Sequence, residues 1–285
     1  MGRIKLGFKL AGKSWQVLRS DASLAWFPFI SGAATVFLFA LLWAPALGFG
    51  LVEFSSSAQS GSSTNIIGWL LLALTAYLAT TVAVFCNVAL ASCVAHSLEG
   101  KDTSLGQGFT VAGSRIKQIL AWAFISTVVS MLIRTLQQRG GLAGLVLGSL
   151  GGIAWSLATL FVVPVVALEG VGPIDALKLS AQTFKARWGE GLVGNALIGL
   201  VTSLSVMLCL AAMLGGAILL GPVSAQALIA WLAFWLMLIL ALSAVMAALN
   251  QVFNTSLYIF SKEGVAKGPF TEQEFQAAFR PKKKR

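Results

Sequence analysis

The sequence predicts an all-α fold, a polytopic transmembrane helical bundle of about six spans arranged as three helical-hairpin repeats. Three observations lead to this prediction. Of the 285 residues, 57% are hydrophobic and only 11% are charged, whereas roughly a quarter of the residues in a soluble domain are charged. The charged residues lie in short segments that separate long uncharged intervals. These short segments also resemble one another, and such self-similarity indicates an internal repeat.

The uncharged intervals are long enough to cross a bilayer. A helix of about 18 apolar residues can do so, because it pairs its own backbone groups in lipid. The third interval is the weakest, since only 16 residues lie between Lys117 and Arg134, which is about 24 Å of helix. We keep it as a span because Arg134 can extend its charged group to the membrane surface. The expected spans cover residues 24–52, 66–95, 119–133, 142–168, 192–220 and 223–249.

The orientation of these spans follows from Lys and Arg, which accumulate in cytoplasmic loops. With these spans, 18 of the 20 Lys and Arg residues fall on the side of both termini, and only Arg134 and Arg139 fall on the other. We therefore expect a multi-pass membrane protein with both termini in the cytoplasm. It forms one integral membrane domain, 1–285, with a basic amphipathic helix at 1–23, the six-span bundle at 24–260 and a basic cytoplasmic tail at 261–285.

The basic side is expected to contact anionic lipids of the phospholipid bilayer. Because membrane topology accounts for the net charge of +10 and for the C-terminal PKKKR, no nucleic-acid partner is expected. No protein partner is indicated.

Three polar segments each precede an odd-numbered span and share a pattern. They read GFKLAGKSWQVL at 7–18, GFTVAGSRIKQIL at 108–120 and ALKLSAQTFKAR at 176–187, and Ser180 replaces an alanine of the first two. Each predicts an amphipathic helix with an apolar stripe, such as Phe8, Ala11, Trp15 and Leu18 in the first copy. Such a helix lies in the membrane interface or packs on the cytoplasmic ends of the bundle, and both alternatives stay open. The candidate lipid or surface contacts are Lys5, Lys9, Lys13, Trp15, Lys178, Lys185 and Trp188.

The first copy contains GFKLAGKS, which matches the phosphate-loop pattern G-x-x-x-x-G-K-[ST]. A phosphate loop needs a buried strand immediately before it, and only MGRIKL precedes Gly7. These six residues include two basic ones and cannot form a central strand. We therefore expect a surface helix here and no bound nucleotide.

The even-numbered spans end in SLEG, ALEG and SKEG. A glycine in this place is the usual left-handed helix stop. The acids Glu99, Glu169 and Glu263 oppose the helix dipole, so we expect each to pair with a lysine or arginine of an interfacial helix. After the last one, the capping box from Thr271 to Glu274 predicts a short amphipathic helix that ends near Phe279.

Small residues and prolines predict features of the packing. Gly140, Gly144, Gly148 and Gly152 place a smooth face on the fourth span, which lets another helix approach closely, within the bundle or in a dimer. Local kinks are expected at Pro28, Pro45 and Pro164.

Five stretches together resemble an uncharacterised family of bacterial six-helix integral membrane proteins. They are the G-F-x-x-A-G-x-S-W start, FCNVALASCVAHSLEG, IAWSLATLFVVPVVALEG, GPIDALKLSAQTFKARWGE and ALNQVFNTSLYIFSKEG. More distantly, the chain looks like the membrane domains of some glycerophosphodiester phosphodiesterases. The resemblance implies a location in the bacterial inner membrane and a six-span topology. It implies no activity and no catalytic residue.

The sequence indicates no catalytic, cofactor-binding or metal site. The predicted span cores carry no charge, His96 is the only histidine, and the three cysteines, Cys86, Cys93 and Cys209, have the pattern of small apolar residues. We therefore expect a non-enzymatic protein with a role in envelope organisation or lipid interaction. The alternative is a transporter or channel for a small uncharged or anionic solute. Its polar residues, which also suit bonding between helices, are Asn87, Asn195, Thr202, Ser205 and Asn250.

Overall fold

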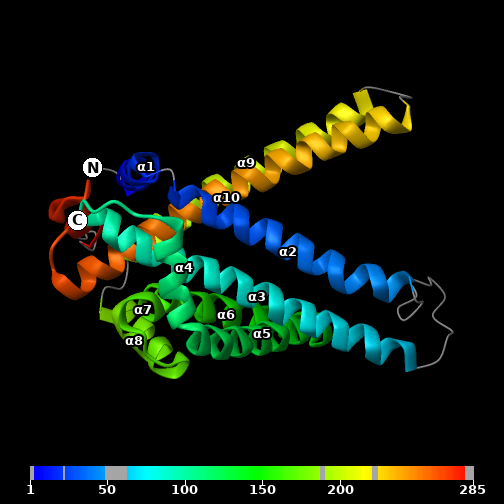
Figure 1. Ribbon diagram of the computed structural model, residues 1–285, viewed down its shortest axis with the longest axis horizontal. Coiled ribbons are helices and arrows are strands. Elements are labelled where there is room, and N and C mark those ends of the chain that lie inside the picture. Colours follow the sequence, from blue (N-terminus) through cyan, green and yellow to red (C-terminus); the bar gives the residue numbers. More distant parts are fainter. Residues whose placement is uncertain (1–2, 22, 49–62, 187–189, 220–223, 280–285) are drawn as a thin grey trace.

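The computed structural model describes residues 3–21, 23–48, 63–186, 190–219 and 224–279, and over these ranges the chain is almost wholly helical (Figure 1). The helices are α1 (Arg3–Ser20), α2 (Ser23–Gly48), α3 (Ser63–Leu98), α4 (Leu105–Ser114), α5 (Ile116–Arg139), α6 (Gly141–Ala158), α7 (Val162–Glu169), α8 (Pro173–Ala186), α9 (Glu190–Leu219), α10 (Ala225–Glu263) and α11 (Glu272–Phe279).

Three helical hairpins form the body of the molecule: α2 with α3, α5 with α6, and α9 with α10. Among the described residues, five helical stretches are long and apolar enough to cross a membrane: Ser23–Gly48, Ile66–Leu98, Ile116–Arg139, Gly141–Glu169 and Gln226–Glu263. In the fifth predicted span, α9, the apolar stretch found is the shorter Val201–Gly216. The third predicted span is longer than expected, since α5 has 24 residues. The structure thus supports a membrane protein with several spans.

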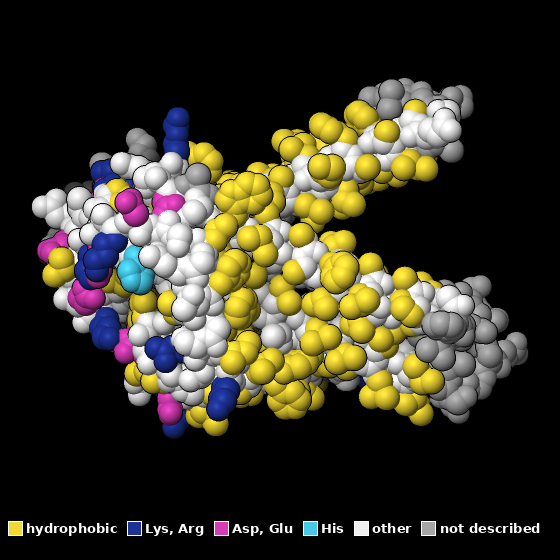
Figure 2. All heavy atoms as spheres, viewed as in Figure 1, with side chains coloured by type: hydrophobic (Ala, Val, Ile, Leu, Met, Phe, Trp, Pro, Cys, Tyr) yellow, Lys and Arg dark blue, Asp and Glu magenta, His cyan; other side chains and the backbone are white. Residues whose placement is uncertain are grey.

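The hairpins meet at one end and diverge toward the other, where α9 and α10 point away from α2 and α3 (Figure 1). Lys, Arg, Asp, Glu and His side chains gather at the shared end, and along the described arms the coloured side chains are mostly hydrophobic (Figure 2). We call this end, formed by α1, α4, α8, α11 and the adjoining ends of α3, α7 and α10, the charged end. The first and last helices of the described residues, α1 and α11, both lie there (Figure 1).

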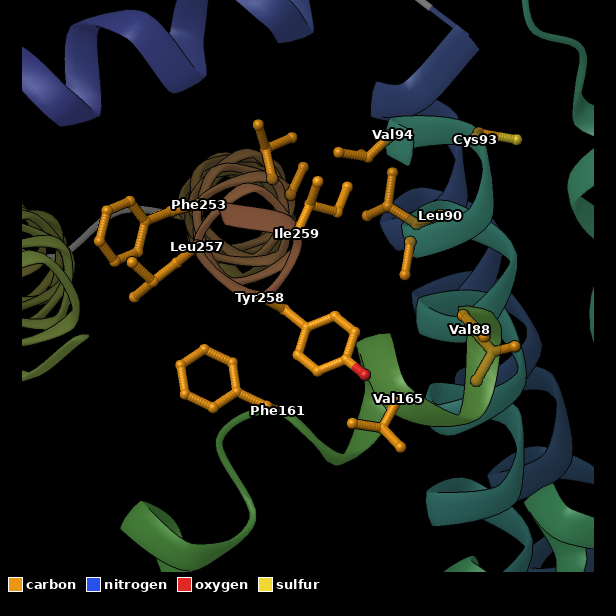
Figure 3. Packing of buried hydrophobic residues seen from close by; sticks show 14 of the residues in the cluster. Val88, Leu90, Cys93, Val94, Phe161, Val165, Phe253, Leu257, Tyr258 and Ile259 are labelled. Carbon is orange, nitrogen blue, oxygen red and sulfur yellow. The ribbon is translucent and has the colours of Figure 1, made fainter. Parts of the chain in front are cut away.

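The hydrophobic core also lies near the charged end. There, Phe253 and Leu257 of α10 are buried together with Leu90 of α3 and Val165 of α7 (Figure 3). Further along α10 the side chains are exposed, as Met237 is at 71%. Exposed apolar residues over a length of this kind suit lipid contact. The charged end therefore carries most of the tertiary packing.

Small residues allow close contact within the hairpins. A Cβ on Gly144 would lie 2.4 Å from the backbone oxygen of Leu136 in α5, and one on Gly148 would lie 2.5 Å from Cγ of Gln137. The glycine face, Gly140 and Gly152 included, is therefore turned toward α5, inside the bundle.

Two helix boundaries differ from the expected spans. The sixth span was expected to end at residue 249, but α10 continues to Glu263 and has 39 residues, or about 58 Å of helix. It therefore extends beyond the hydrocarbon region and reaches the charged end. The fourth span is interrupted between α6 and α7, just before Pro164, whereas α2 continues through Pro28 and Pro45.

Candidate functional site at the charged end

The three polar segments that precede odd-numbered spans are helical, as α1, α4 and α8. The segment that matches a phosphate loop lies inside α1, from Gly7 to Ser14, and the described residues before it, from Arg3 on, are helical too. The backbone N–H groups of a continuous helix are bonded to its own carbonyls, so they are not free to surround a phosphate. The expectation of a helix is confirmed. The threefold repeat itself stays a prediction.

Helix α1 packs on the ends of α9 and α10 with a face that differs from the predicted stripe. Leu10, Ser14 and Val17 are buried, while Trp15 is 47% exposed. Of the predicted stripe, Leu18 is buried against the bundle and Trp15 is not, because α1 is turned to place Leu10 and Ser14 inward. Trp15 points away from the bundle and remains available for contact at the membrane surface.

Helix α4 rests closely on α3 through Gly108. A Cβ at this position would lie 2.7 Å from Cζ of Phe27, 2.8 Å from Sγ of Cys93 and 3.0 Å from the carbonyl oxygen of Ala89. Only a glycine allows this approach without displacing its neighbours. The small residue that the three polar segments share at this place thus has a packing role in α4.

The two ends of the chain are joined by one acid. Glu274 of α11 is paired with Lys9 of α1 at 3.0 Å and with Lys13, and its Oε2 also accepts the N–H of Thr271 at 3.0 Å. Burial raises the pKa of this carboxyl, but hydrogen bonds from Lys13, Lys9 and Thr271 outweigh that effect and lower the pKa to about 2. Phe275, the next residue, is buried and stacks on Phe260. Lys9 and Lys13 therefore hold α11 against α1.

The three Glu-Gly ends adopt the predicted left-handed stop. The φ angles are +74° at Gly100, +66° at Gly170 and +74° at Gly264. This conformation is costly for any residue with a Cβ and explains why glycine follows the glutamate each time.

The three glutamates do form ion pairs, but the predicted partners were wrong. Glu99 pairs with Lys101 at 2.7 Å and with Lys267 at 3.1 Å, and Lys267 also lies 2.9 Å from Glu263. None of these lysines belongs to α1, α4 or α8. The reason is the length of α10, which brings the chain beyond it next to the end of α3. The hydrogen bond from Lys101, followed by that from Lys267, lowers the pKa of Glu99 to about 2.

Arg115, between α4 and α5, packs directly on the helix stop of α7. A Cβ on Gly170 would lie 2.1 Å from Nη1 and 2.2 Å from Cζ of the guanidinium. Gln118 donates from Nε2 to the backbone oxygen of Gly170 at 3.2 Å. Arg115 Nε is buried and has no hydrogen-bond partner among the described residues. Gly170 is thus required both for its φ angle and for the approach of Arg115.

The break between α6 and α7 is closed by a side chain from α8. Pro164 lacks an N–H and its ring conflicts with a helical carbonyl four residues earlier. The chain tightens there, so that the N–H of Phe161 and the carbonyl of Ala158 have no helical partner. Ser180, which is fully buried, accepts from Phe161 N at 3.0 Å and donates to the oxygen of Ala158 at 2.6 Å. The serine that departs from the repeat pattern therefore satisfies both groups.

A pocket of about 360 Å³ opens where α7, α8 and α10 meet. Glu169 Oε1 accepts a hydrogen bond from the hydroxyl of Tyr258 at 3.1 Å and is paired with Lys262. Ser261 donates to the backbone oxygen of Tyr258 at 2.7 Å. Leu179, Gln182 and Thr183 of α8 complete the lining. This pocket combines an acid, a base and uncharged polar groups at the level where the spans end.

Sequence reasoning had singled out Glu169 as an ion-pair acid but had not linked it to a pocket. Tyr258, Gln182 and Thr183 were missed, because they meet only through the packing of α8 on α7. The signal that the sequence offered was the Glu-Gly helix end, which marks Glu169 and none of these three residues.

The other predicted residues lie apart from this pocket. Lys178 and Lys185 are exposed on α8, and Lys178 lies 3.7 Å from Asp175. Trp188 and the side chains of Lys5 and Asn195 lie outside what the structure describes. The polar residues of the alternative solute path, Asn87, Thr202, Ser205 and Asn250, line neither this pocket nor a second one of about 290 Å³ between α1 and the end of α3.

The remaining candidates for chemistry are isolated. His96 is exposed at the charged end, with Nδ1 2.9 Å from the backbone oxygen of Ser92. Cys86, Cys93 and Cys209 are unpaired thiols. Among the described residues, no three His, Cys, Asp or Glu side chains come together in a way that could hold a metal ion.

Comparison with known protein families matches residues 66–268, from α3 to the segment after α10. The comparisons with curated proteins and with solved structures find no match. The distant likeness to the membrane domains of glycerophosphodiester phosphodiesterases therefore stays a prediction. The matched range covers well over half of the chain and includes every residue of the pocket. The chain belongs to the DUF6159 family, a family of unknown function.

Proposed function

We propose that the protein is a non-enzymatic, six-span protein of the bacterial inner membrane whose charged end lies in the cytoplasm and binds anionic lipid. Its role would be in envelope organisation or lipid interaction. The observation that carries the proposal is the gathering of charged side chains at one end of an otherwise apolar surface (Figure 2). Basic residues next to membrane spans favour the cytoplasmic side and attract the anionic lipids of that leaflet.

Some cations of the charged end are paired with acids and others are not, and this difference supports the proposal. Several lysines of the charged end, Lys9 and Lys13 among them, are already paired with acids. Arg19, Lys117 and Lys185 are exposed and take part in none of the ion pairs found in the described residues. Each such cation near an anionic bilayer contributes about 1 kcal/mol of attraction.

The experiment compares lipid retention by the full chain, purified in mild detergent from bilayers of equal phosphatidylglycerol and phosphatidylcholine content. A variant with Arg19→Gln, Lys117→Gln and Lys185→Gln is expected to lose most of its preference for phosphatidylglycerol. The matched control, Arg134→Gln with Arg139→Gln, removes two exposed cations from α5 and is expected to retain the preference. Equal retention by both variants, or no preference in the unchanged protein, would refute the proposal.

A further inference from the structure

We propose that the pocket between α7, α8 and α10 binds a phosphoethanolamine group, with the primary ammonium on Glu169 and the phosphate on Lys262. This goes beyond anionic-lipid contact at the surface, because the two ligands differ in charge and bind at different residues. The pocket has about 360 Å³, near the lower end of the roughly 300–1,000 Å³ of small-molecule sites. That volume suits a headgroup and not a whole lipid.

The Glu169–Lys262 pair has unused hydrogen-bonding capacity. Both Tyr258 and Lys262 donate to the same carboxylate oxygen, Oε1. Oε2 receives no hydrogen bond from the residues that the structure describes, so it can accept one from an ammonium group. The ammonium of Lys262 has three donors, and its side chain is 56% exposed. Lys262 can therefore bind a phosphate while its ammonium stays close to Glu169.

The balance of charge selects the ligand. One carboxylate and one ammonium give the pocket no net charge. An anion alone would therefore be repelled by Glu169, and a cation alone would be repelled by Lys262. A zwitterion with the opposite order of charges complements both. A quaternary ammonium fits less well, because it has no N–H to donate to Oε2.

Uncharged groups on α8 supply further contacts. The side chains of Gln182 and Thr183 line the pocket and have no hydrogen-bond partner among the described residues. Each can donate to a phosphate oxygen. Leu179, which is 37% exposed, stands at the same pocket. Glu169 ends α7 and Lys262 lies one residue before the end of α10, so the pocket sits where the apolar spans give way to polar chain. Lipid headgroups occupy this level of a bilayer.

The test measures which lipids the purified full chain retains, by native mass spectrometry from micelles with equal amounts of phosphatidylethanolamine, phosphatidylcholine and phosphatidylglycerol. The unchanged protein is expected to retain phosphatidylethanolamine at least about tenfold better than phosphatidylcholine, the effect of one hydrogen bond to a charged group. Glu169→Gln and Lys262→Gln should each abolish that preference. Glu99→Gln is the matched control, since Glu99 precedes the same kind of helix stop, pairs with lysines and lines neither pocket.

If Glu169→Gln fails to fold, Gln182→Leu and Thr183→Val change the pocket and leave the ion pair intact, and each should weaken retention. A second arm offers soluble phosphoethanolamine and phosphocholine to the protein in detergent alone. Stronger binding of the lipid than of soluble phosphoethanolamine assigns the site to a bilayer lipid, and equal binding assigns it to a free phosphoethanolamine ester. Equal retention of all three lipids, or a preference that survives Glu169→Gln, would overturn the proposal. The variant of Arg19, Lys117 and Lys185 can lose its preference for phosphatidylglycerol without any change in the retention of phosphatidylethanolamine. The two measurements therefore test the two proposals independently.

Discussion

The clearest perturbation is Ser180→Ala, which removes the hydroxyl that closes the break between α6 and α7. The substitution leaves the N–H of Phe161 and the carbonyl of Ala158 without their partner. Phe161 is only 2% exposed, so water does not replace the lost bond at the donor. An unsatisfied buried group costs about 1–3 kcal/mol. Because Ala158 is partly accessible, we expect the free energy of unfolding to fall by about 2–4 kcal/mol for the two groups together.

Ser14→Ala is the matched control. Ser14 is also fully buried, but its hydroxyl donates only to the oxygen of Leu10, at 3.2 Å within the same helix. That carbonyl keeps its helical partner when the hydroxyl is removed, so the expected loss is below about 1 kcal/mol.

The assay is reversible unfolding of each variant by a denaturing detergent, with hydrogen exchange of the amides around Phe161 as a local reading. Ser180→Ala should unfold at lower denaturant and exchange faster at Phe161. The reasoning is refuted if both serine variants lose the same stability, or if exchange at Phe161 does not change.

Two other perturbations test the helix stop of α7 and the contact between the chain ends. Gly170→Ala should cost about 1–2 kcal/mol for its left-handed φ and more for displacing Arg115. Gly100→Ala is the control, because its φ is similar and a Cβ there would have no atom within 4 Å. It should lose only the stability that the left-handed φ costs. Equal losses of stability in the two variants would contradict the role of Arg115. The folded-state pKa of Glu274 is about 2, below its ordinary value, so the stability that this carboxylate contributes is present above about pH 4.5 and is lost as the pH falls toward 2. Limited proteolysis of α11 should show this loss, and Glu274→Gln should remove the pH dependence in that window.

The helices and the helix stops followed from local chemistry. The long uncharged intervals could form only helices in lipid, and the Glu-Gly ends adopt the left-handed stop that glycine permits at Gly100, Gly170 and Gly264. The segment from Gly7 to Ser14, which matches a phosphate loop by its letters, is helical as its apolar stripe predicted. Periodicity and spacing within one segment suffice for such conclusions.

The partners of the charged groups depended on packing. Sequence reasoning paired Glu169 with an interfacial helix, whereas the length of α10 brings Lys262 to it. It left open whether the first amphipathic helix met lipid or the bundle. The structure packs that helix on the bundle through Leu10 and Ser14.

The sequence by itself determined a helical membrane protein with a basic end, because hydropathy, charge distribution and glycine stops act over a few neighbouring residues. The tertiary structure alone decided that α8 lies across the break at Phe161 and that Tyr258, Gln182 and Thr183 share one pocket with Glu169. The physical reason is that these contacts join residues up to 89 positions apart. Their pairing depends on helix lengths and on the rotation of each helix about its axis, which a pattern within one segment does not specify.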